Sequence, residues 1–539
     1  MLARRWVVIE TGSNQALVFQ TNKQRLNVAA SRLIWRVGFE WIPDAVAAAG
    51  GAGAGVEQVV KASGLGIILA PPDLGSQIIE AVTTRATLEA PDLEVWGVVG
   101  DINVADDLSN VGPTLGWAQR QLARWRADRP SPIARDPNLP FTRLCPFTGR
   151  PATTEVSEGT SQQRVHHSAA AGIAALWQSS MEDRDQLVGS LGGSEIVERA
   201  VVSRDDLKSG DGVRNNGWIG VLHADGNGIG DIFTNLRRVD LPGQEVIDLL
   251  NSVSEALERC AWNAVQTAIE RTDAMIAEAD GKPRSSWVLP ILVGGDDITV
   301  LLHGRYALEF TVILAEEFER LVNAEEAVTD ALAYVSIAQS DWHRGGLITS
   351  VTVPDRITLA CGLVYTKPHH PFSHAVDLAE ELTKSAKTVK HEGLSALDVH
   401  VLNESAVRGL DQVRAPLDVG GRKLWAGPIV LGDADHPRHL DGLRAAMRLM
   451  VHAEGNEHPV PSGVLHGLRE ALTTGGEADL AAVRARAKEV ARERGYEDNL
   501  TTLLDEHLEF EGAEPFSRLL TAMELLDVTS GTVAGNRDD

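Results

Sequence analysis

Cysteine is scarce in this chain, which has three cysteines among its 539 residues. They are Cys145, Cys260 and Cys361, and their odd number and wide spacing match neither a disulfide framework nor a zinc-binding motif. The sequence therefore favours a protein of the reducing cytoplasm.

Basic residues are also in the minority, because 50 lysines and arginines stand against 75 acidic residues and give a formal net charge of −25. A protein that coats nucleic acid needs a basic surface to displace the counterions of the phosphates. The charge balance argues against that class of protein, but it is compatible with a local basic pocket for a triphosphate.

Long apolar runs are missing as well. No stretch of about 18 apolar residues is free of charge, which is the length that a membrane-spanning helix needs. Near the N-terminus, Glu10 ends the apolar run of residues 6–9, which is too short for a signal peptide. We therefore expect a soluble protein that does not cross a membrane.

The length predicts about three domains. The predicted parts are residues 1–125, a small α+β domain; residues 126–214, a partly helical linker or insertion rich in Pro, Arg, Thr and Ser; residues 215–405, a second α+β domain; and residues 406–535, a helical domain. The helices expected in the last part cover residues 443–453, 463–472, 478–494 and 515–526.

The second α+β domain has the clearest pattern. Apolar runs predict strands at residues 218–223, 287–293, 298–302, 357–365 and 397–402, and apolar residues spaced by three or four predict helices at 245–279, 307–321 and 372–390. The order β-α-β-β-α-β is the split ferredoxin-like arrangement, with one extra strand at the end.

The strand that ends at His223 leads into a glycine-rich turn. Asp225 stands at the strand tip, and the glycines that follow it allow close backbone approach and turn amides toward phosphate oxygens. An ordinary surface turn is the alternative interpretation of this segment.

A second acidic turn, Gly294-Gly295-Asp296-Asp297, joins two apolar strands. Adjacent carboxylates repel each other, and bound cations would explain the pair, whereas a solvated hairpin tip is the alternative. In the predicted sheet this turn and Asp225 converge at one edge. Mg²⁺ favours a few carboxylates plus substrate phosphates, and two such ions suit nucleotidyl transfer.

A triphosphate also needs positive charge. The helix predicted at residues 372–390 offers Lys384, Lys387 and Lys390, three residues apart on one face. The alternative is a solvated face that suits the C-terminal end of the helix dipole.

Together these segments resemble the large polymerase-like subunit of type III CRISPR effector complexes, the "Cas ten" family. The similarity covers residues 1–100 and 215–405 well and the helical end loosely. The segments that carry it are residues 221–230, the GGDD motif in 292–297, 359–364, 371–372, 378–382, 386–387 and 397–400. It implies two ferredoxin-like Palm domains and a helical C-terminal domain.

The resemblance also implies an activity, the conversion of ATP or another NTP into cyclic oligoadenylate-type messengers in antiviral defence, by attack of a 3′-hydroxyl on an α-phosphate. Asp225, Asp296 and Asp297 would be catalytic and would hold Mg²⁺ or Mn²⁺. The nucleotide would meet Gly226, Asn227, Gly228, Gly294, Gly295, Lys384 and Lys387. Partners would be nucleoside triphosphates, other effector subunits and guide or target RNA.

Several departures from the family pattern modify this expectation. The N-terminal Palm has no acidic pair in its hairpin near residues 64–70, so we expect a degenerate partner domain. The chain begins directly in that Palm, so we expect a compact form without the HD nuclease domain. Cys145 alone remains of the zinc finger, which makes zinc improbable, and Asn227 replaces a second acid of some relatives.

Three other functions compete. A catalytically silent scaffold of an RNA-guided complex would explain the family features without chemistry, although it has no need of the adjacent aspartates. A diguanylate cyclase would carry Glu-Phe where Asp297-Ile298 stands. A template-directed polymerase would need a thumb and a less acidic surface. Because ATP is always present in a cell, we also expect synthesis to be gated by relative movement of the two Palms.

Overall fold

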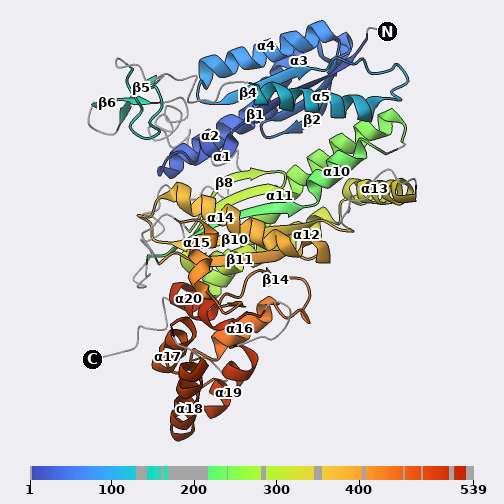
Figure 1. Cartoon of the computed structure of the whole chain (residues 1–539). Coiled ribbons are helices and arrows are strands. Elements are labelled where there is room, and N and C mark those ends of the chain that lie inside the picture. The colour runs from blue at the N-terminus through green and yellow to red at the C-terminus, as the bar shows by residue number, and fades with distance from the viewer. Residues whose placement is uncertain are drawn as a thin grey trace.

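The structure is a computed structural model of the whole chain (Figure 1), and it describes residues 3–128, 142–152, 154–158, 163–167, 217–239, 241–280, 287–344, 355–403, 408–452, 456–474, 477–508 and 515–529. The N-terminal, central and helical C-terminal parts follow one another along the molecule. The predicted α+β fold class is confirmed. Most of the partly helical segment predicted at residues 126–214, including residues 168–214, lies outside the described residues.

The N-terminal domain is built on a four-stranded antiparallel sheet in the order β2-β3-β1-β4. Its elements are β1 (Arg5–Gly12), α1 (Asn14–Val18), α2 (Gln24–Arg36), the π-helical turn η1 (Val37–Trp41), α3 (Ile42–Ala48), η2 (Gly51–Ala54), β2 (Glu57–Ala62), β3 (Leu65–Ala70), α4 (Pro72–Glu89), β4 (Glu94–Val99) and α5 (Val111–Ala127). This strand order is that of the ferredoxin-like fold.

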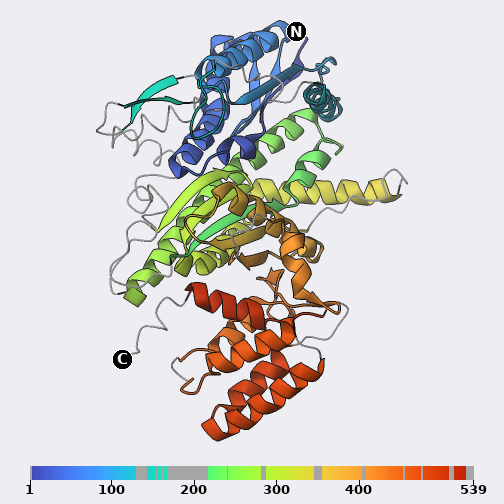
Figure 2. The same ribbon diagram turned by 60° about the vertical axis from the view of Figure 1, so that its left-hand side comes forward.

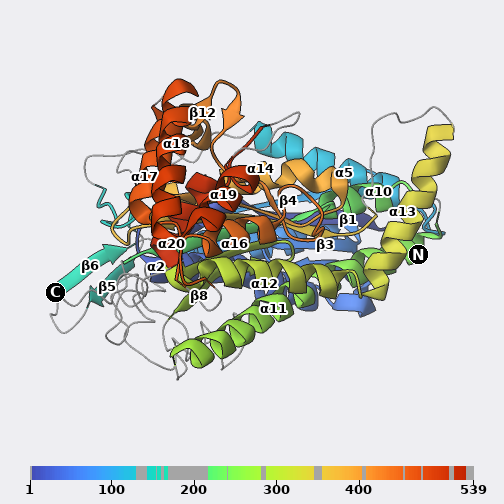
Figure 3. The same ribbon diagram turned by 90° about the horizontal axis from the view of Figure 1, so that it is seen from below.

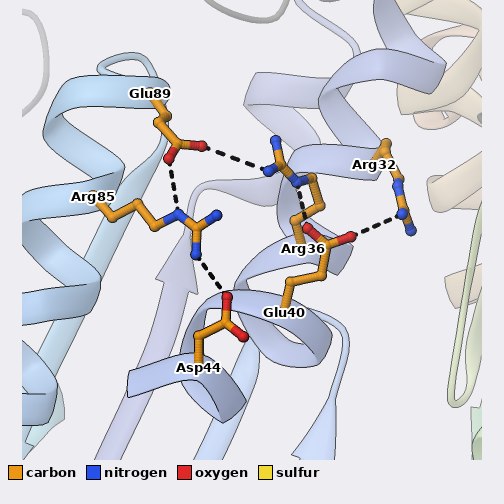
Figure 4. Close-up of polar contacts among 6 residues, drawn as sticks. All are labelled: Arg32, Arg36, Glu40, Asp44, Arg85 and Glu89. Carbon is orange, nitrogen blue, oxygen red and sulfur yellow. Dashed lines mark hydrogen bonds and ion pairs between the residues drawn. The ribbon is translucent and has the colours of Figure 1, made fainter. Parts of the chain in front are cut away.

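A chain of ion pairs ties the helices of this domain together (Figure 4). Glu40 accepts from Arg32 at 2.9 Å and from Arg36 at 2.7 Å, which joins η1 to α2. Arg85 on α4 pairs with Glu89 at 2.8 Å and with Asp44 of α3 at 2.9 Å. These ion pairs join the helices at the edge of the domain. The sheet itself is held by buried apolar side chains.

The central domain has a six-stranded sheet in the order β14-β11-β10-β7-β9-β8. Its elements are β7 (Ile219–Asn227), α10 (Ile229–Leu236), α11 (Gly243–Asp280), β8 (Val288–Gly294), β9 (Asp297–His303), α12 (Gly304–Val322), α13 (Glu326–Arg344), β10 (Thr358–Thr366), α14 (Phe372–Ala386), η3 (Lys387–Glu392) and β11 (Ala396–Val401). The core repeats the order of the N-terminal sheet, and β11 is added parallel to β10.

The two sheet domains pack against each other (Figure 2). Helix α11 of the central domain lies on β2 of the N-terminal domain. At the start of α14, the rings of Phe372 and Phe19 meet edge to face at 6.0 Å, and the Phe372 amide donates to the Asn22 side chain at 2.6 Å. One continuous apolar core therefore links the domains.

Helices dominate the C-terminal part, which Figure 3 shows from its own end. Its elements are α15 (Leu410–Arg414), η4 (Ala415–Leu417), the short strands β12 (Asp418–Val419), β13 (Arg422–Lys423) and β14 (Ile429–Val430), and helices α16 (Leu440–Arg448), α17 (Ser462–Thr473), α18 (Glu477–Arg494), α19 (Glu497–Glu506) and α20 (Leu519–Thr529). Helix α20 packs on α12 and β11. No helix in the described part of the chain is long and apolar enough to cross a membrane.

The cysteine-containing segment between the sheet domains forms a tight turn. The Cys145 amide donates to the Arg150 carbonyl at 2.8 Å, and the Gly149 amide donates back to Cys145 at 2.9 Å. The buried Cys145 packs against Leu26 and Ala29 of α2. This cysteine thus has a packing role in the described structure, and β5 (Thr154–Glu158) and β6 (Gln163–His167) form a separate hairpin after it.

Candidate active site

Strand register brings the predicted aspartates to one end of the central sheet. Asp225, near the end of β7, lies directly opposite Asp297, the first residue of β9. Directly opposed residues in an antiparallel pair point to the same face, so these two carboxylates share a face. The Gly226 amide donates to the Asp296 carbonyl at 3.1 Å and fixes the acidic turn against β7.

Glycine is required at two points of this turn. Gly295 has φ of +61°, a backbone conformation that side chains disfavour. A Cβ on Gly226 would lie 2.5 Å from Ile229 Cδ1 and 2.9 Å from the Asp296 Cβ. Both glycines therefore allow the strand tip and the hairpin to approach closely.

The acidic turn is electrostatically strained. Burial, and then the neighbouring Asp225, raise the pKa of Asp296 to about 6. Burial and the charges of Asp296, Asp225 and Glu380 raise the pKa of Asp297 well above its usual range, although 38% of its side chain is exposed. A cation placed among these carboxylates would stabilise their charged forms.

One lysine already faces the acidic group. Lys387, at the C-terminal end of α14, lies with its Nζ 2.7 Å from Asp225 Oδ1. The exposed Lys384 instead lines a separate cavity of about 780 Å³ together with Glu381, Arg414 and Trp425. The two lysines of the predicted pair therefore face different surroundings.

The buried side chain of His223 lies beside Asp297 of the acidic turn. Burial lowers the pKa of His223 to about 4, so the imidazole is neutral at pH 7. Its Nδ1 lies 3.1 Å from Thr299 Oγ1 and 3.5 Å from Asp297 Oδ1. The Thr383 hydroxyl donates to the His223 carbonyl at 2.9 Å and ties α14 to β7. Sequence reasoning missed both residues, because buried polar side chains inside strands and helices give no motif.

The predicted Asn227 has a structural contact. Its buried amide donates to Thr358 Oγ1 of β10 at 2.9 Å. Gly228, with φ of +88°, begins α10 directly after it. The backbone of this turn is thus available to a ligand beside Asp225, whereas the Asn227 amide nitrogen braces the sheet.

A cavity of about 370 Å³ lies between the two sheet domains, next to the acidic turn. Its walls come from β2, β3, α5, α10, α11 and the turn itself, and its apolar lining includes Val60, Leu65, Ile67, Leu115, Phe233, Leu250 and Leu257. Gly294, Gly295 and Asp296 of the acidic turn also line it. The size and apolar lining are those of a small-molecule pocket.

Glu258 of α11 is a further residue of this cavity that sequence reasoning missed. Its Oε2 accepts the Gly295 amide of the acidic turn at 2.9 Å. Burial raises the pKa of its carboxyl, while the Gly295 amide and the Trp262 indole oppose that rise. A glutamate within a long amphipathic helix gives no sequence signal, because its partner lies 37 residues away.

The residues present fit a divalent cation shared with a substrate. Among the described residues, no group of three His, Cys, Asp or Glu side chains is placed to hold an ion by itself. Asp225 and Asp297 nevertheless share one face, Asp297 Oδ1 is buried without a hydrogen bond, and the Lys387 ammonium already occupies a cation position beside Asp225. Mg²⁺ is commonly held by one or two carboxylates plus substrate phosphates, which is the donor set here.

Two packed β-α-β-β-α-β domains, with a GGDD turn between β8 and β9 of the central one, are typical of the palm-domain class. Residues 218–394 match the family model of Cas10/Cmr2, second palm domain. The central domain is thus similar to the second palm domain of that family, and we refer to the N-terminal and central domains as the first and second palm.

One solved structure has a similar fold. A crystal structure of a Csm1–Csm4 cassette in complex with pppApA matches with a TM-score of 0.51 and 13% identity, over 98% of this chain and 69% of that one. Csm1 in T. onnurineus matches with a TM-score of 0.47 and 12% identity, over 98% and 70% of the two chains. No curated protein sequence matches the chain at a significant level.

Proposed function

We propose that this chain is a nucleotidyltransferase that joins nucleoside triphosphates, ATP foremost, and closes the product into cyclic oligonucleotides for antiviral signalling. The main support for the proposal is that Asp225 lies directly opposite Asp297 on neighbouring strands, with the Lys387 ammonium beside Asp225. The cavity between the palms supports it, because a base placed there lies next to the same turn.

The reaction needs one bond to form and one to break. The 3′-hydroxyl oxygen of one nucleotide bonds to the α-phosphorus of the next, and the bond to pyrophosphate breaks. Asp225 and Asp297, with Asp296 beside them, would hold Mg²⁺ or Mn²⁺, which would acidify the hydroxyl and neutralise the leaving pyrophosphate. Lys387 would contact the phosphates, and Gly294 and Gly295 would line the nucleotide. The amides of Gly226 and Gly295 are already donated to Asp296 and Glu258, so they hold the turn in place.

The assembly is part of the proposal. The similar Csm1 chains were crystallised with Csm4, in complexes with pppApA, with cA4 and with ATP. We propose that this chain joins a comparable subunit and an RNA guide in the cytoplasm. Gating would act through the contacts of Phe19 and Asn22 with Phe372, because they hold the first palm on the helix that carries Lys387.

The test is a product assay. Purified protein is incubated with each NTP and Mg²⁺ or Mn²⁺, and the products are identified by mass spectrometry. We expect oligonucleotides from the native protein and none from the double variant Asp296→Ala, Asp297→Ala. Absence of products and of nucleotide binding, even with cell extract or candidate RNAs as activators, would favour the silent scaffold instead.

A further inference from the structure

The cavity between the palms contains one carboxylate whose hydrogen bonding is incomplete. Glu258 Oε2 accepts the Gly295 amide at 2.9 Å, which orients the carboxylate. Its Oε1 is buried, and it makes no hydrogen bond within the described structure. A buried carboxylate oxygen of this kind calls for a donor, since its desolvation is otherwise uncompensated.

The walls of the cavity around that oxygen are largely apolar. Leu257, the neighbour of Glu258 on α11, lines the cavity with Leu65 and Ile67 of the first palm. An aromatic base inserted between such walls buries its faces and presents only its edge to polar groups. Glu258, which lines the same cavity, is then positioned to meet that edge.

A purely structural role for Glu258 explains only half of its geometry. Clamping the Gly295 amide uses one oxygen, and a glutamine in its place would do the same through its amide oxygen. The second oxygen is an acceptor and not a donor when ionised. It makes no hydrogen bond in the described structure, although the Trp262 indole also lies near the carboxyl group. What it selects is a ligand group that carries N–H hydrogens.

We propose that Glu258 is a base-selecting residue, whose free Oε1 accepts a hydrogen bond from the 6-amino group of an adenine bound in the cavity between the palms. This inference rests on the proposed function, and it assigns the choice of base to one side chain. Helix α11 thereby couples two tasks, since the same carboxylate fixes the acidic turn and reads the base beside it.

The test compares two ligands that differ in one group. Purine riboside 5′-diphosphate lacks only the 6-amino group of ADP, and neither ligand can release pyrophosphate, so no reaction complicates the titration. Calorimetry on the native protein should give about 10- to 100-fold tighter binding of ADP, which is the range for a hydrogen bond to a charged group. In Glu258→Gln the side-chain oxygen keeps the Gly295 amide and the NH₂ group turns to the base, so the ratio should fall below about 3-fold.

Two further variants separate this role from general damage. Glu255→Gln removes the same charge from an exposed position of the same helix and should keep the native ratio. Glu258→Asp withdraws the carboxylate by one methylene and should also lower the affinity ratio of the two ligands. This variant provides the test if Glu258→Gln does not fold. The ratio is internal to each protein, so a loss of folded fraction affects both ligands equally.

The outcomes distinguish this inference from the proposed function. If the native protein makes oligonucleotides from ATP but Glu258→Gln keeps the native ratio, the base-selecting role is wrong and the enzyme stands. If the native protein binds neither diphosphate, the base-selecting role is also wrong, and product formation from ATP decides the enzyme separately. A ratio that collapses in both Glu258 variants and persists in Glu255→Gln establishes the role.

Discussion

The two palms have the same strand order, but different side chains stand at equivalent register positions. Glu10 of β1 faces Leu65 of β3, as Asp225 of β7 faces Asp297 of β9. The backbone contact is also repeated, because the Thr11 amide donates to Gly64 as the Gly226 amide donates to Asp296. The backbone frame of the site thus exists twice in this chain.

The side chains decide which copy is equipped for chemistry. In the first palm, an apolar Leu65 stands opposite Glu10, and the Arg126 guanidinium pairs with that glutamate. In the second palm, three carboxylates crowd one turn, and burial raises the pKa of two of them. Fold alone therefore does not define this site. The three crowded carboxylates of the second palm define it.

The largest effect should come from the second palm's hairpin. Asp297→Asn keeps the shape of the turn but removes a charge that the proposed cation needs. We expect product formation to fall at least about 10³-fold, measured as pyrophosphate release from ATP. The matched change Asp231→Asn, at an exposed position of α10, should leave the rate within about 3-fold, and an equal loss there would contradict a specific role.

The second-largest effect on activity should come from a substitution of Lys387. Lys387→Met removes the ammonium that faces Asp225 and should lower kcat/KM for ATP by about 10- to 100-fold, since a charged contact to phosphate is lost. Lys390→Met, at an exposed position one turn further on, is the control. Equal effects of the two changes would assign the loss to overall charge instead of to this contact.

Because the acidic turn is electrostatically strained, removing the charge of Asp296 should increase the stability of the protein by an amount that depends on pH. The pKa of Asp296 in the folded protein, about 6, is above the ordinary aspartate value of 3.8. The contribution of this group to stability is therefore full below pH 3.8 and is lost as pH rises through 6. In chelator, Asp296→Asn should stabilise the protein at pH 8 by about 1–2 kcal/mol, discounted for partial exposure, and less at pH 5. Thermal unfolding at both pH values measures this, and a gain independent of pH would refute it.

The smallest effect is expected from the ion pairs of the first palm. Arg85→Met breaks the pairs with Asp44 and Glu89 and a cation–π contact with Trp41. We expect a loss of about 1 kcal/mol in unfolding free energy, smaller in 0.5 M salt, with synthesis unchanged. Arg486→Met, at an exposed position of α18, should lower the unfolding free energy by less. A larger loss in Arg486→Met than in Arg85→Met would contradict a stabilising role for the ion pairs of Arg85.

Much of the fold is readable from the sequence, because periodicity records which face of an element is buried. The apolar spacing of residues 245–279 predicts α11, which extends over Gly243–Asp280. Strand β2, helix α13 and helix α19 were not predicted. Only Val59 and Val60 of β2 are buried, and a short strand of this kind carries little signal by itself.

The site was predictable where it is local in sequence. Asp225 and the GGDD turn stand at strand ends, so their convergence follows from the strand order. The roles of Glu258, His223 and Thr383 depend on contacts between distant segments, which no spacing within one element encodes. Lys384 and Lys387 illustrate the limit, because helical periodicity places them on one face while the structure gives them different neighbours.

The most direct test compares the two register-equivalent acids. Asp225→Asn and Glu10→Gln are assayed beside the native protein for oligonucleotide formation from ATP and Mg²⁺, under the conditions and with any activator that the native protein requires. We expect Asp225→Asn to abolish the product and Glu10→Gln to leave the rate within about 3-fold of the native value. Loss of the product in Glu10→Gln with synthesis retained in Asp225→Asn would contradict the assignment of chemistry to the second palm.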